Sequence, residues 1–140
     1  MQPEKAAEIR QWLAKAADDL RAARIDLRAS PPLIEDALFH CQQASEKAMK
    51  GFLTAHDVVF RKTHDLDELA SACERLDQSL ADTLDPARDL TVFAWGFRYP
   101  GDMGEPSLDE AKQMLQIASR VYNGISKRLG GQADVSDDAG

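Results

Sequence analysis

The sequence predicts an all-α fold, an up-and-down bundle of four to five helices. Apolar residues recur at alternating spacings of three and four along most of the 140-residue chain, which is the period of an amphipathic helix. Residues that break helices separate these runs, at Pro31-Pro32, Pro100-Gly101 and Gly130-Gly131. No segment alternates between apolar and polar residues over a useful length, so the sequence contains no strand signal.

The first two predicted helices cover residues 4–29 and 33–56. The apolar stripe of the first helix consists of Ile9, Leu13, Ala16, Leu20, Ala23 and Leu27. Charged residues such as Asp19 fall on other faces of that helix. The stripe of the second helix is small at its centre, at Ser45 and Ala48, which favours close approach by a partner helix.

The later helices are predicted from their capping residues. The third covers residues 65–80, the fourth opens at Asp85-Pro86, and the fifth covers residues 107–129. An Asp or Ser at each start can cap the helix, and proline suits the first helical position. At the fifth helix, Ser107 and Glu110 have the spacing of a capping box.

The length and the charge distribution predict one domain with a tail. We expect the helical bundle to occupy residues 1–130 and an acidic, disordered tail to occupy residues 131–140. The formal net charge is −7, and the tail supplies three of these negative charges. This net negative charge argues against a protein that binds duplex DNA over its whole surface.

Composition also bears on compartment and cofactors. The apolar runs are too short to span a membrane, and the N-terminus lacks the apolar region of a secretion signal, so we expect a cytoplasmic protein. Cys41 and Cys73 are then expected to be reduced core residues. No pair of Cys or His has the spacing of a metal finger, and His40 and His56 lie too far apart to share an ion on one helix. We therefore predict neither a metal nor a cofactor.

Two segments carry candidate binding residues. Gln43, Glu46, Lys47 and Lys50 lie on one polar face of the second helix. This face is either solvated, with a Glu46–Lys50 pair, or it lines a groove in which Lys47 or Lys50 meets a phosphate. His64 stands just before a predicted helix N-terminus, which favours anion binding or acid–base chemistry, unless it only holds the loop.

A third candidate segment follows the predicted fourth helix. Arg98 and Tyr99 combine a cation with an aromatic ring that can stack on a base. The alternative is structural: Arg98 near a helix C-terminus satisfies carbonyl groups, and Tyr99 packs beside Trp95.

Taken in order, these segments resemble the HEPN family of small all-α domains. The resemblance is carried by Trp12-Leu13, Ala17–Leu20, Ala37–Lys50, Thr63–Leu66, Arg98–Pro100 and Glu110-Ala111, and is collinear over about residues 7–129. It implies a bundle of four or five helices that usually forms a dimer.

The HEPN resemblance implies two kinds of function. Many members look like metal-independent endoribonucleases, in which an Arg is followed by a His after four to six residues. Others are nucleotide-binding or non-catalytic, and both kinds often occur beside a minimal nucleotidyltransferase as a toxin–antitoxin-like pair. None of His40, His56 and His64 has an Arg at the required distance, so we predict no catalytic residues.

The sequence as a whole therefore predicts a HEPN-like, nucleotide-associated binding module. We expect a homodimer, a minimal nucleotidyltransferase as partner, and a nucleotide or single-stranded RNA as ligand. The predicted binding residues are Lys47, Lys50, His64, Arg98 and Tyr99. One alternative is an RNA-cleaving toxin with a non-standard site built from Arg98 and His64. The other is a purely structural dimer.

Overall fold

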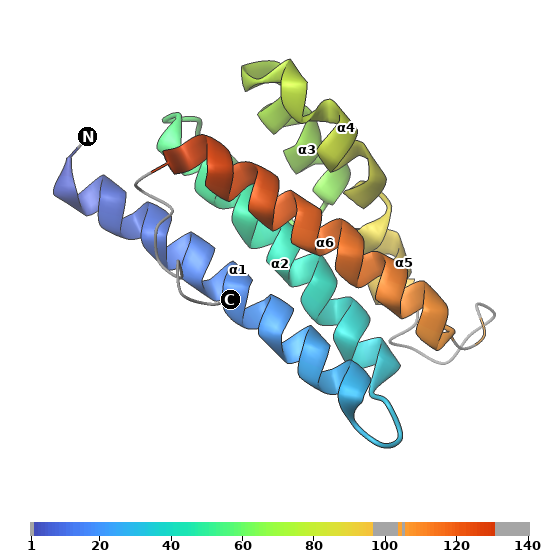
Figure 1. Cartoon of the computed structure of the whole chain (residues 1–140). Coiled ribbons are helices and arrows are strands. Elements are labelled where there is room, and N and C mark those ends of the chain that lie inside the picture. Colours follow the sequence, from blue (N-terminus) through green and yellow to red (C-terminus); the bar gives the residue numbers. More distant parts are fainter. Residues whose placement is uncertain (1, 97–103, 105, 131–140) are drawn as a thin grey trace.

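The computed structural model describes residues 2–96, 104 and 106–130, and all regular structure within them is helical. Its α-helices are α1 (Pro3–Arg28), α2 (Ile34–Ala55), α3 (Leu66–Leu76), α4 (Ala81–Leu84), α5 (Leu90–Gly96) and α6 (Leu108–Leu129). The all-α prediction is confirmed. Figure 1 shows α1 and α2 as a long antiparallel pair with α6 beside them. Because α2 packs against α1, α6, α3 and α5, it is the central helix. In the described part of the chain, no helix has the length and apolarity that crossing a membrane requires.

Helix α1 agrees with the predicted range, and one charged residue outside its apolar stripe is nevertheless buried. Five members of the predicted apolar stripe are buried, and Leu27 is partly buried against the same core. Asp19, however, is only 8% exposed. Its carboxylate accepts hydrogen bonds from His40 and Lys47, both on α2. Asp19 is buried because α2 covers this side of α1 and supplies donors for its carboxylate.

The predicted close approach to α2 is confirmed by its small buried residues. Ser45 and Ala48 have no exposed surface. A Cβ atom added to Gly51 would lie 3.1 Å from Cβ of Trp12 on α1. That distance is tighter than ordinary van der Waals contact, so the absence of a side chain at Gly51 brings α1 against α2.

The third helix is shorter than predicted. Asp65 caps it as expected, accepting a hydrogen bond from the Asp67 N–H at 3.0 Å. The helix ends at Leu76 rather than at residue 80, because Asp77 is extended, with φ of −151°. The Asp77 carboxylate accepts the Ser79 N–H and caps a separate 3-10 turn, Gln78–Leu80.

The predicted start of the fourth helix was also wrong in position. Asp85-Pro86 opens a 3-10 turn (Asp85–Ala87), and α5 begins only at Leu90. Instead of capping a helix, the Asp85 carboxylate accepts a hydrogen bond from Arg88 at 2.9 Å, which holds the pKa of Asp85 below its usual range. Arg88 also pairs with Asp67 and Glu74, both on α3. This guanidinium therefore connects the 3-10 turn at Asp85–Ala87 to α3.

Helix α6 follows the prediction at both ends. The Ser107 hydroxyl accepts the Glu110 N–H at 3.0 Å, and the Glu110 carboxylate accepts the Ser107 N–H at 2.8 Å. This confirms the capping box. Gly130 has a φ of +58°, a conformation that favours glycine and ends the helix. The predicted tail, residues 131–140, lies outside the described residues.

The two cysteines are core residues, as predicted. Cys41 and Cys73 are unbridged and have no exposed surface. Burial raises the pKa of each thiol to about 12. Both are therefore protonated, apolar groups in the folded chain.

Candidate functional site

Helix α2 carries two rows of polar side chains that face different neighbours. Gln42, Glu46 and Lys50, spaced by four residues, face the segment before α3 and the start of α5. Asp36, His40 and Lys47 form the second row, which borders α1. The two rows create two separate polar clusters, and the predicted binding residues are divided between them.

The first cluster is organised around the Glu46 carboxylate, which is 4% exposed. It accepts hydrogen bonds from Gln42 Nε2 at 3.1 Å, from Lys50 Nζ at 3.0 Å and from His64 Nδ1 at 3.0 Å. Because an ionised carboxylate only accepts hydrogen bonds, Nδ1 of His64 carries the proton in this contact. A buried charge satisfied by three donors holds all three donor side chains in place.

His64 combines a fixed backbone with an exposed ring. Its carbonyl oxygen accepts hydrogen bonds from Gln42 Nε2 and from the Thr91 hydroxyl, both at 2.9 Å. The Thr91 oxygen in turn accepts the Leu66 N–H at 3.1 Å. The side chain of His64 is nevertheless 66% exposed. Since Nδ1 is turned inward to Glu46, Nε2 is the ring nitrogen placed to meet a ligand.

Lys50 lies inside the protein rather than on its surface. The residue is 8% exposed, and its ammonium pairs with Glu46. The same ammonium stands 5.9 Å from the centre of the Trp12 ring and 5.8 Å from that of Phe60. These are cation–π distances. The interpretation of this helix face as solvated was wrong for Glu46 and Lys50, since both residues are buried, although the Glu46–Lys50 pair that it included is present.

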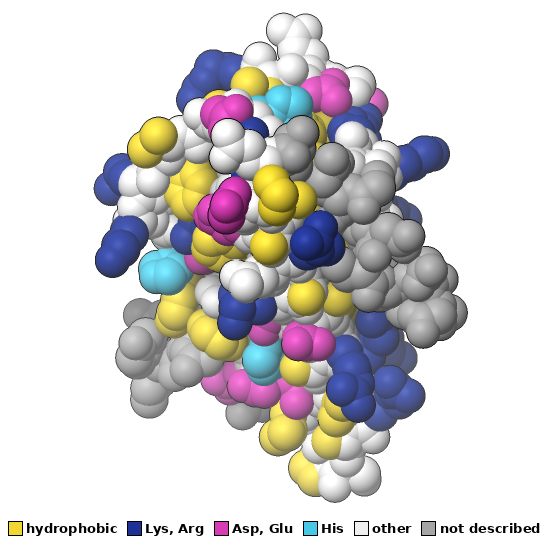
Figure 2. Space-filling model, turned by 90° about the vertical axis from the view of Figure 1, so that its left-hand side faces the viewer, with side chains coloured by type: hydrophobic (Ala, Val, Ile, Leu, Met, Phe, Trp, Pro, Cys, Tyr) yellow, Lys and Arg dark blue, Asp and Glu magenta, His cyan; other side chains and the backbone are white. Residues whose placement is uncertain are grey.

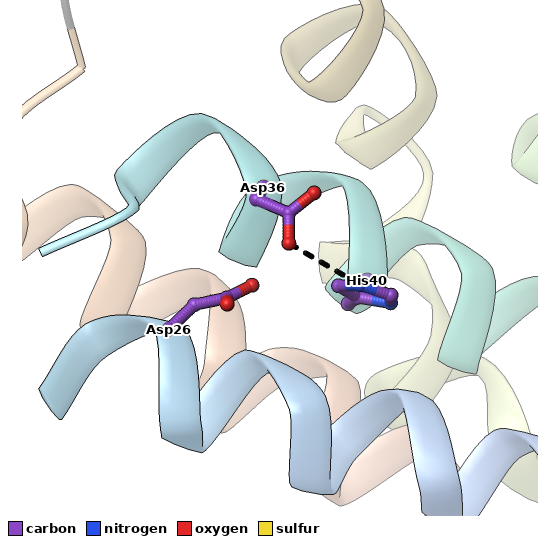
Figure 3. Close-up of side chains that lie close together, drawn as sticks. All are labelled: Asp26, Asp36 and His40. Carbon is purple, nitrogen blue, oxygen red and sulfur yellow. Dashed lines mark ion pairs between the residues drawn. The ribbon is translucent and has the colours of Figure 1, made fainter. Parts of the chain in front are cut away.

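Lys47 belongs to the second cluster. Its Nζ donates to Asp19 Oδ2 at 2.6 Å, and the other oxygen of Asp19 lies 2.8 Å from His40 Nδ1. His40 Nε2 is 3.4 Å from Asp36 Oδ2. Figure 3 shows Asp36 and His40 on α2, with Asp26 reaching toward them from α1. Burial, followed by the neighbouring Asp36, raises the pKa of Asp26 to about 6.

Arg98 and Tyr99, the other two predicted binding residues, lie outside the described residues. The described chain before them ends at Gly96, and Trp95 lies on the His64 side of the molecule. The Trp95 ring centroid is 6.2 Å from that of His64 and 5.4 Å from that of Phe39. Of the predicted binding residues, the structure therefore joins Lys50 and His64 through Glu46 and ties Lys47 to Asp19.

Sequence reasoning missed Gln42, Asp19 and the central role of Glu46. The spacing of Gln42, Glu46 and Lys50 was a usable signal, since it places three polar groups in one row beside the apolar stripe. No comparable signal marked Asp19, whose partners lie more than twenty residues away on α2.

The exposed surface does not supply a continuous basic patch on the face shown in Figure 2. There, Lys and Arg side chains form separate groups between acidic and hydrophobic ones. A phosphate on this face would be held by directed contacts with individual side chains rather than by a broad positive potential.

Comparison with known proteins identifies the family. The HEPN domain model matches residues 9–129, which is most of the chain. The crystal structure of an archaeal HEPN homologue is similar, with a TM-score of 0.65 and 26% sequence identity, covering 86% of this chain and 97% of that chain. A comparison with curated proteins gave no match. The chain therefore belongs to the HEPN domain family.

The buried pair at the centre of the first cluster can be tested by unfolding. Replacing Lys50 by Met leaves the Glu46 carboxylate with only neutral donors or His64, and we expect a loss of about 3 kcal/mol in the free energy of unfolding. Glu46→Gln should cost a similar amount, because it leaves a buried ammonium. The double variant should lose less free energy of unfolding than the sum of the losses in the two single variants. Urea unfolding measures all four proteins, and strictly additive losses would show that the charges do not interact.

Proposed function

We propose that the chain is a nucleotide-associated binding module that works with a minimal nucleotidyltransferase partner. The observation that carries this proposal is the His64 ring, which is exposed to solvent while a buried carboxylate fixes one of its nitrogens. When Nε2 also carries a proton, an exposed imidazolium of fixed orientation can donate that Nε2 proton to a phosphate oxygen. Membership of the HEPN family supports the same function.

The proposed ligand contacts are His64, Arg98 and Tyr99. His64 and Arg98 would bind the phosphate, and Tyr99 would stack on the base. Lys50 has a positioning role in this proposal, because its ammonium holds the Glu46 carboxylate that orients His64. Lys47 would influence the ligand only after leaving Asp19.

Nucleotide binding is tested by calorimetric titration with adenine and guanine nucleotides. We expect affinities in the range of roughly micromolar to millimolar for the wild type. His64→Ala should weaken binding about tenfold or more, because a charge-assisted hydrogen bond is lost. His56→Ala is the matched control, since His56 is also an exposed histidine but lies at the C-terminal cap of α2, and the affinity of this variant should be unchanged.

Two results would contradict this site. An equal response in the wild type, His64→Ala and Arg98→Ala would place the ligand elsewhere. No nucleotide effect on any of the proteins would favour the purely structural alternative.

Metal-independent RNA cleavage is a second candidate function, favoured by one observation. A histidine held by a carboxylate through Nδ1 has the arrangement of a general base whose Nε2 faces the substrate. Against it stands the sequence, in which no His follows an Arg at the family's spacing. We therefore expect purified protein to leave single-stranded RNA intact in the presence of a chelator. Cleavage that persists in chelator and disappears in both His64→Ala and Arg98→Ala would replace the binding function by this one.

We also propose a homodimer. The family implies one, and large hydrophobic side chains remain exposed on the described surface, with Leu33 54% and Val92 69% exposed. Analytical ultracentrifugation at micromolar concentration should give the mass of two chains. A sedimentation profile of monomer alone would contradict the dimer while leaving the nucleotide site open.

A further inference from the structure

Three metal-ligating side chains meet between α1 and α2, in the second polar cluster. Asp26 comes from α1, and Asp36 and His40 come from α2. One candidate ligand atom of each residue lies within 4.8 Å of the others. Figure 3 shows the Asp26 carboxylate reaching toward the gap between the two helices, with Asp36 and His40 across from it.

Asp26 is the member whose position most needs an explanation. It is 8% exposed, and its Oδ2 atom is buried without a hydrogen-bond partner among the described residues. A buried carboxylate oxygen in this condition destabilises the fold unless a cation or a proton reaches it. The side chain nevertheless extends toward two other potential ligands.

The Asp19 carboxylate on α1 orients the His40 ring. Its Nδ1 lies 2.8 Å from Asp19 Oδ1, and because the carboxylate accepts, Nδ1 carries the proton. In the neutral ring, the lone pair of Nε2 then faces the Asp36 side. A histidine that donates one N–H to a carboxylate and presents its other nitrogen is the usual arrangement of a metal-ligating histidine. Lys47 holds the second oxygen of Asp19 at 2.6 Å and so fixes this support.

The charges around this cluster are unbalanced. Asp19, Asp26 and Asp36 are three carboxylates within one small region. Among the described residues, Lys47 is the one lysine or arginine that pairs with any of them, and it pairs with Asp19. Asp26 and Asp36 therefore lie together beside His40, which pairs with Asp36 at 3.4 Å. A divalent cation would balance this pair.

We propose that Asp26, Asp36 and His40 bind a divalent transition-metal ion, with Zn²⁺ as the best fit. One imidazole nitrogen with two carboxylates suits such an ion better than Mg²⁺ or Ca²⁺, which prefer oxygen ligands alone. His40 Nε2 and Asp36 Oδ2 are 3.4 Å apart. Two ligands at Zn²⁺ bond lengths of about 2.0–2.2 Å and a tetrahedral angle are separated by about 3.4 Å.

Side-chain rotation and solvent can complete the coordination of the ion. Asp36 is half-exposed, so its carboxylate can turn toward the ion, and solvent can supply a fourth ligand from that side. This site departs from the prediction of no metal, which considered residues along one helix, whereas these ligands come from two. It does not depend on the proposed nucleotide function, because His64 belongs to the other cluster.

The experiment is a calorimetric titration of the full chain, without a histidine tag, with Zn²⁺. The buried thiols of Cys41 and Cys73 should not compete for the ion. We expect one ion per chain and a rise in the thermal unfolding midpoint, with Mg²⁺ giving neither. Asp26→Asn and Asp36→Asn should each weaken Zn²⁺ binding at least about tenfold. Glu35→Gln, an exposed acidic neighbour outside the set, is the control and should bind as the wild type does.

The variants also separate loss of a ligand from loss of the fold. Asn at position 26 keeps the size of the side chain and removes a buried charge, so the metal-free variant should unfold at or above the wild-type temperature. Equal Zn²⁺ binding in the wild type, Asp26→Asn and Asp36→Asn would overturn the proposal, because the ion would then bind elsewhere. Absence of stoichiometric Zn²⁺ binding by the wild type would also overturn it, and would leave a proton shared by Asp26 and Asp36 as the explanation of this pair.

Discussion

The close packing of α1 against α2 is the constraint on which the rest of the structure depends. Gly51 allows the backbone of α2 to approach Trp12, and Ser45 and Ala48 keep the centre of α2 narrow. Because the two helices approach so closely, polar groups along their contact lose water and must find partners in the protein. Asp19, buried by this packing, finds His40 and Lys47 on α2.

The long helices were predictable from the sequence because their signals are local. Apolar stripes determine which side of α1, α2 and α6 is buried, and Ser107 with Glu110 marks the start of α6. The end of α3 was not predictable, because Asp77 suits either an exposed helix position or a cap. Arg128 on α6 reaches both Asp77 at 3.0 Å and the Ser79 hydroxyl at 2.9 Å. A contact across about fifty residues thus favours the break over a continuous helix.

The candidate site shows the same division between local and long-range information. Helical spacing correctly grouped Glu46 with Lys50, and their ion pair is present at 3.0 Å. The Lys50 ammonium on that face lies near the rings of Trp12 and Phe60, which belong to other segments. A residue on a polar helix face is therefore exposed or buried according to its tertiary neighbours. For that reason the sequence predicted that Lys50 pairs with Glu46, but it did not predict that Lys50 is buried.

The two clusters on α2 differ in how fully their carboxylates are partnered. Around Glu46, one buried carboxylate receives Lys50, Gln42 and His64, so donors outnumber acceptors and an exposed imidazole remains at the edge. Next to α1, carboxylates predominate, and Asp26 Oδ2 has no hydrogen-bond partner within the part of the chain that the structure describes. Lys47 and Lys50 are only three residues apart, yet each is committed to a different cluster. The central helix thus keeps the Glu46–Lys50 pair apart from the Asp19–Lys47 pair.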